Sequence, residues 1–151
     1  MSTPAPLPDL PVTFRPTVTR AVLLGLGAAL FVVLTAGAWL TGSFTAGDRA
    51  TFTAAGLFVF GILALLARPK VVATEDGVTV VNLATTRRLA WAQIVRVDLR
   101  AGDPWVRLDL SDGTTLPAMG IQPGIAKHQA VAHARALRAL AEAHGTARSA
   151  T

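Results

Sequence analysis

The chain contains no cysteine among its 151 residues. Disulfide bonds, thiol nucleophiles and thiolate metal ligands are therefore excluded. The sequence also lacks the GxSxG, HExxH and P-loop patterns of common hydrolases, metalloproteases and nucleotide-binding proteins. We accordingly predict that the protein is not an enzyme and uses no cofactor.

The three histidines do not form a metal site in the sequence pattern. His128 and His133 are five residues apart, which separates them by about 140° around a helix. His133 and His144 share a helical face but stand about 16 Å apart along the axis. We expect His133 to be a packing residue and predict no metal ligands.

Charge is missing from two long stretches, residues 21–41 and 50–67. A helix of about 20 apolar residues spans the hydrocarbon layer of a bilayer, and about 17 still suffice. Neither stretch contains Asp, Glu, Lys, Arg, His, Asn or Gln, the groups that a transport path needs at depth. We predict a two-helix transmembrane hairpin over residues 20–68 that serves as an anchor.

A cleaved signal peptide is the alternative explanation of the first apolar stretch. The apolar part of a signal peptide is usually about 7–15 residues long. The stretch at residues 21–41 is longer, and no clean small-x-small cleavage pattern follows it. We therefore favour an uncleaved anchor.

Basic residues flank the predicted hairpin on its outer sides: Arg15, Arg20, Arg68 and Lys70. The connecting loop carries one Arg and one Asp. Lys and Arg are retained on the cytoplasmic side of a membrane. We expect a two-helix protein of the inner (plasma) membrane with both termini in the cytoplasm, and we expect no nucleic-acid partner despite the net charge of +5.

Five glycines of the two apolar stretches permit close approach between helices. They are Gly25, Gly27 and Gly37 in the first stretch, and Gly56 and Gly61 in the second. Packing within the hairpin is favoured over oligomerisation.

The two ends of the chain are predicted to be disordered tails. Residues 1–19 contain five prolines, which favour extended chain over packed structure. Gly145 is suited to end the preceding helix, so residues 146–151 are expected to form the second tail.

Residues 69–145 are predicted to form a small antiparallel β domain with one C-terminal helix. Short β-rich runs alternate with turn signals such as Asp76-Gly77 and Asp112-Gly113, giving six strands in a meander. From Ala126 to His144 apolar residues recur with helical period, while Lys127, Arg135 and Arg138 fall on the opposite face. We expect this helix to pack on the sheet, with its arginines in solvent; the alternative is that its basic face lies along anionic lipid headgroups.

One strand pairing is specific enough to predict by residue. If residues 101–104 form a four-residue loop, Leu99 pairs with Val106, Val97 with Leu108 and Val95 with Leu110 on one apolar face. The opposite face would then pair Asp98 with Arg107 and Arg96 with Asp109 as cross-strand charges. We interpret these charges as a solvated ladder and not as a site.

The order of motifs resembles a known family. Arg68-Pro69-Lys70 follows the apolar stretches, then come Asp76-Gly77-Val78, Val81-Asn82, the run Arg87–Ile94 containing Trp91, and Leu110–Gly113. This series resembles the bacterial PH-domain family of small membrane proteins that includes the low-molecular-weight protein antigen type. The resemblance implies an α+β fold, a transmembrane hairpin followed by a PH-like domain. A full PH fold has seven strands, one more than the six predicted.

The resemblance implies a membrane-anchored binding or scaffolding module with an unidentified protein partner. An anionic-lipid surface sensor is one alternative, in which Arg68, Lys70, Arg87 and Arg88 contact lipid headgroups. An accessory subunit of a membrane complex, acting through its hairpin, is the other. The loop Thr74–Gly77 is acidic, so specific phosphoinositide recognition is not expected.

Overall fold

The computed structural model describes residues 6–149, with side chains described as far as Gly145. The chain forms two compact units. One is the continuous segment Thr17–Arg68, and the other combines the chain on both sides of that segment. We call the first the hairpin and the second the sheet domain.

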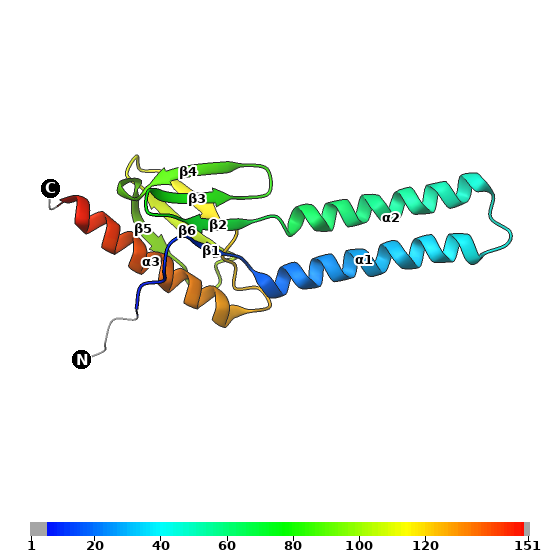
Figure 1. Ribbon diagram of the computed structural model, residues 1–151, viewed down its shortest axis with the longest axis horizontal. Coiled ribbons are helices and arrows are strands. Elements are labelled where there is room, and N and C mark those ends of the chain that lie inside the picture. Colours follow the sequence, from blue (N-terminus) through cyan, green and yellow to red (C-terminus); the bar gives the residue numbers. More distant parts are fainter. Residues whose placement is uncertain (1–5, 150–151) are drawn as a thin grey trace. The chain divides into compact units, whose positions relative to one another are not determined.

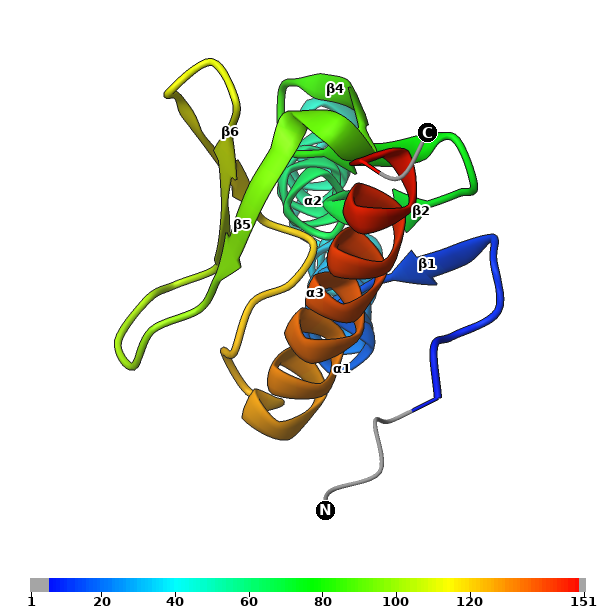
Figure 2. The same cartoon turned by 90° about the vertical axis from the view of Figure 1, so that its left-hand side faces the viewer.

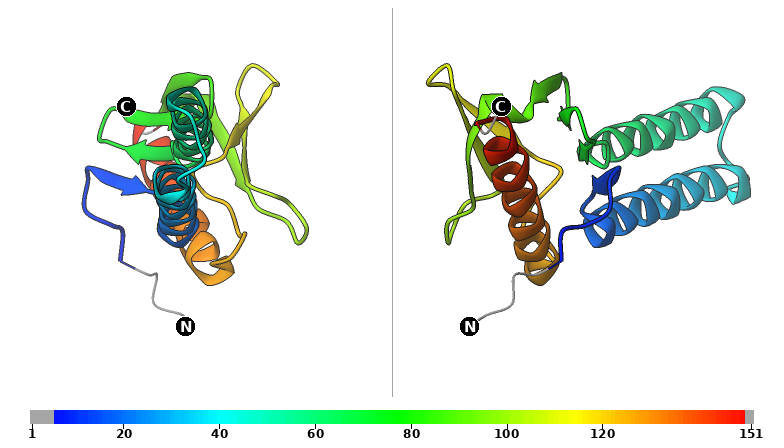
Figure 3. Two further views of the ribbon diagram at one scale, coloured as in Figure 1. Left: turned by 90° about the vertical axis from the view of Figure 1, so that its right-hand side faces the viewer. Right: turned by 60° about the vertical axis from the view of Figure 1, so that its left-hand side comes forward.

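The hairpin consists of helices α1 (Thr17–Leu40) and α2 (Ala46–Leu66), which lie side by side (Figures 1 and 3). Thr45 caps α2, because its hydroxyl accepts from the Asp48 N–H while the Asp48 carboxylate accepts from the Thr45 N–H. Both helices are long and apolar enough to cross a membrane. Only 11% and 6% of their most apolar windows are buried, unlike the core helices of a soluble protein.

Two of the five predicted glycines bring the helices together. A Cβ on Gly27 would lie 3.0 Å from Cδ2 of Phe60, and one on Gly56 would lie 3.3 Å from Cα of Phe31. A Cβ on Gly25, Gly37 or Gly61 would meet nothing within 4 Å. The close packing within the hairpin therefore depends on Gly27 and Gly56.

Within residues 6–149, seven strands form two antiparallel sheets in the sheet domain, not one meander (Figure 2). The four-stranded sheet has the order β1-β2-β3-β4, and the three-stranded sheet has the order β5-β6-β7. The strands are β1 (Val12–Phe14), β2 (Lys70–Ala73), β3 (Gly77–Val81), β4 (Thr86–Ala90), β5 (Ile94–Asp98), β6 (Val106–Leu110) and β7 (Thr115–Ala118). The α+β fold class is confirmed.

The strand missing from the sequence prediction lies before the hairpin. Val12–Phe14 forms β1, in which Phe14 pairs with Val71 of β2 and is 3% exposed. The prediction of a disordered tail over residues 1–19 is therefore wrong at residues 12–14, and also from Thr17, where α1 begins. Residues 1–5 of that tail lie outside the described residues. The hairpin is inserted between the first two strands of the domain.

The predicted register of β5 and β6 is confirmed over three pairs: Arg96 with Asp109, Val97 with Leu108 and Asp98 with Arg107. It fails at the next pair, because Ile94 and not Val95 lies opposite Leu110. Val95 is the extra residue of a β-bulge, and its side chain is 69% exposed.

Helix α3 (Lys127–Ser149) lies between the two sheets in Figure 2 and completes the core. Core side chains come from all three layers, among them Val71, Val80, Val97, Leu108, Leu137 and Leu140. Trp91 opens a short 3-10 turn (Trp91–Gln93) at the corner between the sheets and is buried. The helix continues through Gly145 to Ser149, so the predicted tail is wrong over residues 146–149; the last two residues lie outside the described range.

Gly145 does not end the helix because the conditions for a C-terminal cap are not met there. A capping glycine adopts positive φ, whereas the glycines with positive φ among the described residues are Gly102, Gly113 and Gly124. A glycine within a helix is tolerated at a cost of about 1 kcal/mol relative to alanine.

Candidate functional site

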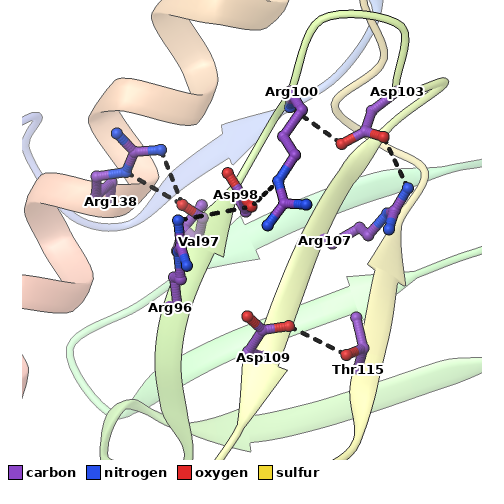
Figure 4. A network of polar contacts seen from close by, with 9 residues as sticks. All are labelled: Arg96, Val97, Asp98, Arg100, Asp103, Arg107, Asp109, Thr115 and Arg138. Atoms are coloured by element: carbon purple, nitrogen blue, oxygen red, sulfur yellow. Dashed lines mark hydrogen bonds and ion pairs between the residues drawn. The ribbon is translucent and has the colours of Figure 1, made fainter.

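The outer edge of β5 is the most distinctive polar feature of the sheet domain (Figure 4). Among the described strands, β5 pairs with β6 alone and is the end strand of its sheet. On the other side, the Arg138 guanidinium of α3 donates two hydrogen bonds to the Val97 carbonyl, at 3.1 Å from Nε and 2.9 Å from an Nη atom. The prediction that the arginines of this helix are simply solvated is therefore wrong for Arg138.

The charges beside this edge do not pair as the sequence predicted. Asp98 accepts a hydrogen bond from the Arg100 guanidinium at 2.8 Å and lies 3.8 Å from the Arg96 guanidinium. Both arginines precede the loop, as Asp98 does, and do not come from the opposite strand β6. Arg107 instead pairs with Asp103 at 2.7 Å, and Asp109 accepts from the Thr115 hydroxyl at 3.0 Å. The backbone register is right, but the long arginine side chains reach along the strand and into the loop (Figure 4).

Loop geometry explains this change of partners. Asp103 accepts from the Arg100 backbone N–H at 3.0 Å through one carboxylate oxygen and from Arg107 through the other. The Asp103 carboxylate therefore binds Arg107, the arginine predicted to pair with Asp98 across the strands.

A groove of about 450 Å³ lies between β5 and the last turns of α3. Its strand wall is Ile94–Val97, and its helix wall is Arg138, Ala141, Glu142 and Gly145. These helix residues are spaced i, i+3, i+4 and i+7, so they share one face. The groove thus combines a strand edge, an exposed valine and arginine side chains.

The four residues predicted to contact lipid do not form one patch within the sheet domain. Lys70 begins β2, and Arg87 and Arg88 are neighbours on β4, so their side chains point to opposite faces of the sheet. Through the strand pairing, Arg87 shares the core-facing row of Val80, and Arg88 shares the outer row of Thr79. Arg68 belongs to the other unit, at the end of the hairpin. Lipid contact by these residues stays a prediction.

Arg87 has a weak electrostatic effect on the turn between β6 and β7. The pKa of Asp112 in that turn is lowered chiefly by hydrogen bonds from the Thr114 hydroxyl and backbone N–H, and to a smaller extent by the charge of Arg87.

Two histidines of α3, His133 and His144, serve in packing, whereas His128 is exposed. His133 lies against Phe14 with ring centroids 5.2 Å apart, and burial lowers its pKa. His144 stacks on Trp91 at 4.8 Å, and its Nδ1 lies 2.9 Å from the Leu140 carbonyl oxygen. Within residues 6–149, no group of three or more His, Asp or Glu side chains could hold a metal ion.

Two sheets of four and three antiparallel strands, closed by a C-terminal helix, give the architecture that the motif series implied. Residues 68–140 match the bacterial PH domain family. This segment belongs to that family. The sheet domain is therefore PH-like, with β1 supplied from outside the matched segment, and we refer to it below as the PH domain.

The relatives found for the chain are mycobacterial. The uncharacterized protein Rv1417 of Mycobacterium tuberculosis and the uncharacterized protein Mb1452 of Mycobacterium bovis are each 34% identical over 97 residues, which cover 64% of this chain. The match spans 62% of the length of each relative. No solved structure matches the chain.

Sequence reasoning did not find the β5 groove of the PH domain. The bulge at Val95 was hidden because Ile94 and Val95 are both apolar, and the alternation alone assigned Val95 to the apolar row of Val97. The spacing of Arg138, Ala141, Glu142 and Gly145 was visible, but a side chain bonded to a strand carbonyl leaves no pattern in sequence.

Proposed function

We propose that this protein is a non-catalytic binding module, a PH domain held at the cytoplasmic face of the membrane by its inserted hairpin. The observation that carries the proposal is the pairing of β1 with β2 on either side of two apolar helices. Phe14 and Val71 are partners in one sheet, so both ends of the hairpin return to the same domain. A pair of helices crossing a bilayer leaves its two ends on one side, as this pairing requires.

The basic flanks of the hairpin support the cytoplasmic side. Arg15, Arg20, Arg68 and Lys70 lie outside the connecting loop, where the positive-inside rule places cytoplasmic charge. An anchored domain is confined to a thin layer, which raises its effective concentration for partners in or near the membrane.

The absence of cysteine makes the topology directly testable. Ser43→Cys in the loop between the helices and Ser111→Cys in the PH domain each create a single thiol at an exposed residue. On intact cells, a membrane-impermeant maleimide should label Ser43→Cys only. Ser111→Cys should react after the membrane is permeabilised. Labelling of Ser111→Cys on intact cells would contradict the cytoplasmic placement.

Partner binding is tested by crosslinking in the native membrane followed by mass spectrometry. The binding-module proposal predicts crosslinks from the PH domain to a protein, and these should persist when residues 17–68 are exchanged for an unrelated two-helix anchor. Loss of capture on that exchange would favour an accessory subunit acting through the hairpin. Lipid adducts alone, weakened by salt, would favour the lipid sensor.

A further inference from the structure

The free side of β5 offers backbone groups for an additional strand. The Val97 carbonyl points away from β6, since it accepts from α3. In an antiparallel ladder, the N–H and C=O of one residue point to the same side of the strand. The Val97 N–H therefore also faces the groove.

Arg138 covers the free edge of β5 through its two hydrogen bonds to the Val97 carbonyl. An incoming strand can displace this side chain, because a guanidinium can exchange one oxygen acceptor for another with little change in geometry. Covering an edge strand with a charged side chain prevents unspecific strand pairing. The neighbouring wall is open at Gly145, where an added Cβ would meet nothing within 4 Å.

The charge around the edge favours an anionic occupant. Arg96, Arg100 and Arg138 gather around the Asp98 carboxylate and the Val97 carbonyl (Figure 4). Glu142 adds one further carboxylate on the helix wall. The strand edge thus carries three guanidinium groups against two carboxylates, with the exposed Val95 beside them.

We propose that this groove binds an extended acidic peptide from a partner protein as an additional strand on β5. The peptide backbone pairs with Val97, an apolar peptide side chain packs on Val95 and Ala141, and Arg138 moves from the Val97 carbonyl to a peptide carboxylate. This inference rests on the proposed function and names the binding surface and the chemistry of its partner. A lipid surface fits the site less well, since it supplies no backbone N–H groups for a strand edge.

The test selects binders from a displayed library of random eight-residue peptides on the full chain in nanodiscs. The expected sequences alternate apolar residues with Asp or Glu. A synthetic peptide from the selection should bind the natural chain and lose at least about tenfold in affinity on Gly145→Trp, which fills the groove. Gly145→Ala is the matched control and should bind as the natural chain does.

The role of Arg138 is tested with the same peptide. Arg138→Met should weaken binding at least about tenfold, because a charge-assisted contact to the peptide carboxylate is lost. The same change at the exposed Arg135, which does not line the groove, should leave affinity unchanged. Replacing Asp and Glu of the peptide by Asn and Gln should reproduce the Arg138→Met loss and make the two changes non-additive.

Three results would overturn the proposal: a selection without acidic sequences, equal binding to Gly145→Trp, or additive effects of the Arg138 and peptide changes. Exchange of the Val97 amide hydrogen gives a separate readout and should slow when the peptide binds. If the selection fails while crosslinking still captures a protein on the PH domain, the groove is wrong and the binding module stands. If both fail, the proposed function fails as well.

Discussion

The hairpin exposes large apolar side chains of the kind that the PH domain buries. In the hairpin, Val33 and Phe58 are 66% and 70% exposed, whereas Leu108 and Leu137 of the PH domain are 0% exposed. The hairpin keeps its smallest residues inside, with Gly27 and Gly56 at the helix contact. The domain encloses its largest ones, including Trp91. The comparison teaches that the exposed apolar surface of the hairpin suits hydrocarbon, in keeping with the proposed membrane anchor, whereas the enclosed core of the domain suits water.

The largest expected effect comes from the strand that joins the two regions. Phe14→Ala should destabilise the PH domain by about 3–5 kcal/mol, because it removes a buried ring and leaves a cavity beside Val71. Denaturant unfolding of the full chain in nanodiscs measures this. Thr13→Ala, an exposed position on the same strand, is the control and should change little. Equal effects at both positions would show that β1 is not part of the core.

Within the hairpin, we expect an intermediate effect from overpacking. Gly27→Leu should weaken the helix contact by about 1–3 kcal/mol, since its Cβ alone would lie 3.0 Å from the Phe60 ring. Gly25→Leu, whose Cβ meets nothing, should be nearly neutral. Hydrogen exchange of α1 and α2 in nanodiscs gives the opening free energies. A larger effect at Gly25 would place the helix contact on another face, or between copies of the chain.

Protonation of His133 should lower the stability of the PH domain at acidic pH. Burial lowers its folded-state pKa below 6.5, so the unfolded chain binds more protons in acid. Stability is then full above about pH 6.5 and falls as pH drops from that value toward the folded pKa, by less than about 1.4 kcal/mol per pH unit for one partly buried group. Unfolding midpoints at pH 7.5 and 5.5 measure the change. His133→Gln should flatten the slope, and an unchanged slope would assign it to other groups.

The smallest expected effect is an increase in the stability of the PH domain. Gly145→Ala should stabilise the PH domain by up to about 1 kcal/mol, because alanine lowers the conformational entropy cost of the helix and its Cβ meets open space. The melting temperature of the same preparation reports it. Destabilisation would mean that α3 does end near Gly145.

Much of the fold could be predicted because local pattern determines it. Six strands and the packed face of α3 follow from periodicity and turn residues. The turn glycine at Gly113 has φ of 82°, as expected, whereas Gly77 lies inside β3 without positive φ. Strand β1 could not be predicted, since three residues between prolines carry no periodic signal and pair only with a segment beyond the hairpin.

The candidate site was less accessible to sequence reasoning because its contacts are long-range. Arg138 and Val97 are 41 residues apart, and no local pattern joins them. The bulge at Val95 turns one apolar side chain outward without changing the residue types around it. Arginine partners also depend on side-chain reach, so a correct register did not give the correct ion pairs.

If the hairpin crosses the membrane as proposed, the position of β1 makes folding of the four-stranded sheet depend on insertion of both helices. Ribosomes release β1 first, then both helices, and only afterwards the strand that β1 must pair with. In the proposed topology, a chain whose second helix fails to cross the membrane has β1 and β2 on opposite sides of the bilayer. Phe14 then cannot pair with Val71 or enter the core. Such a chain presents an incomplete sheet to cellular proteases. In the proposed topology, the four-stranded sheet can therefore be completed only after both helices have crossed the membrane.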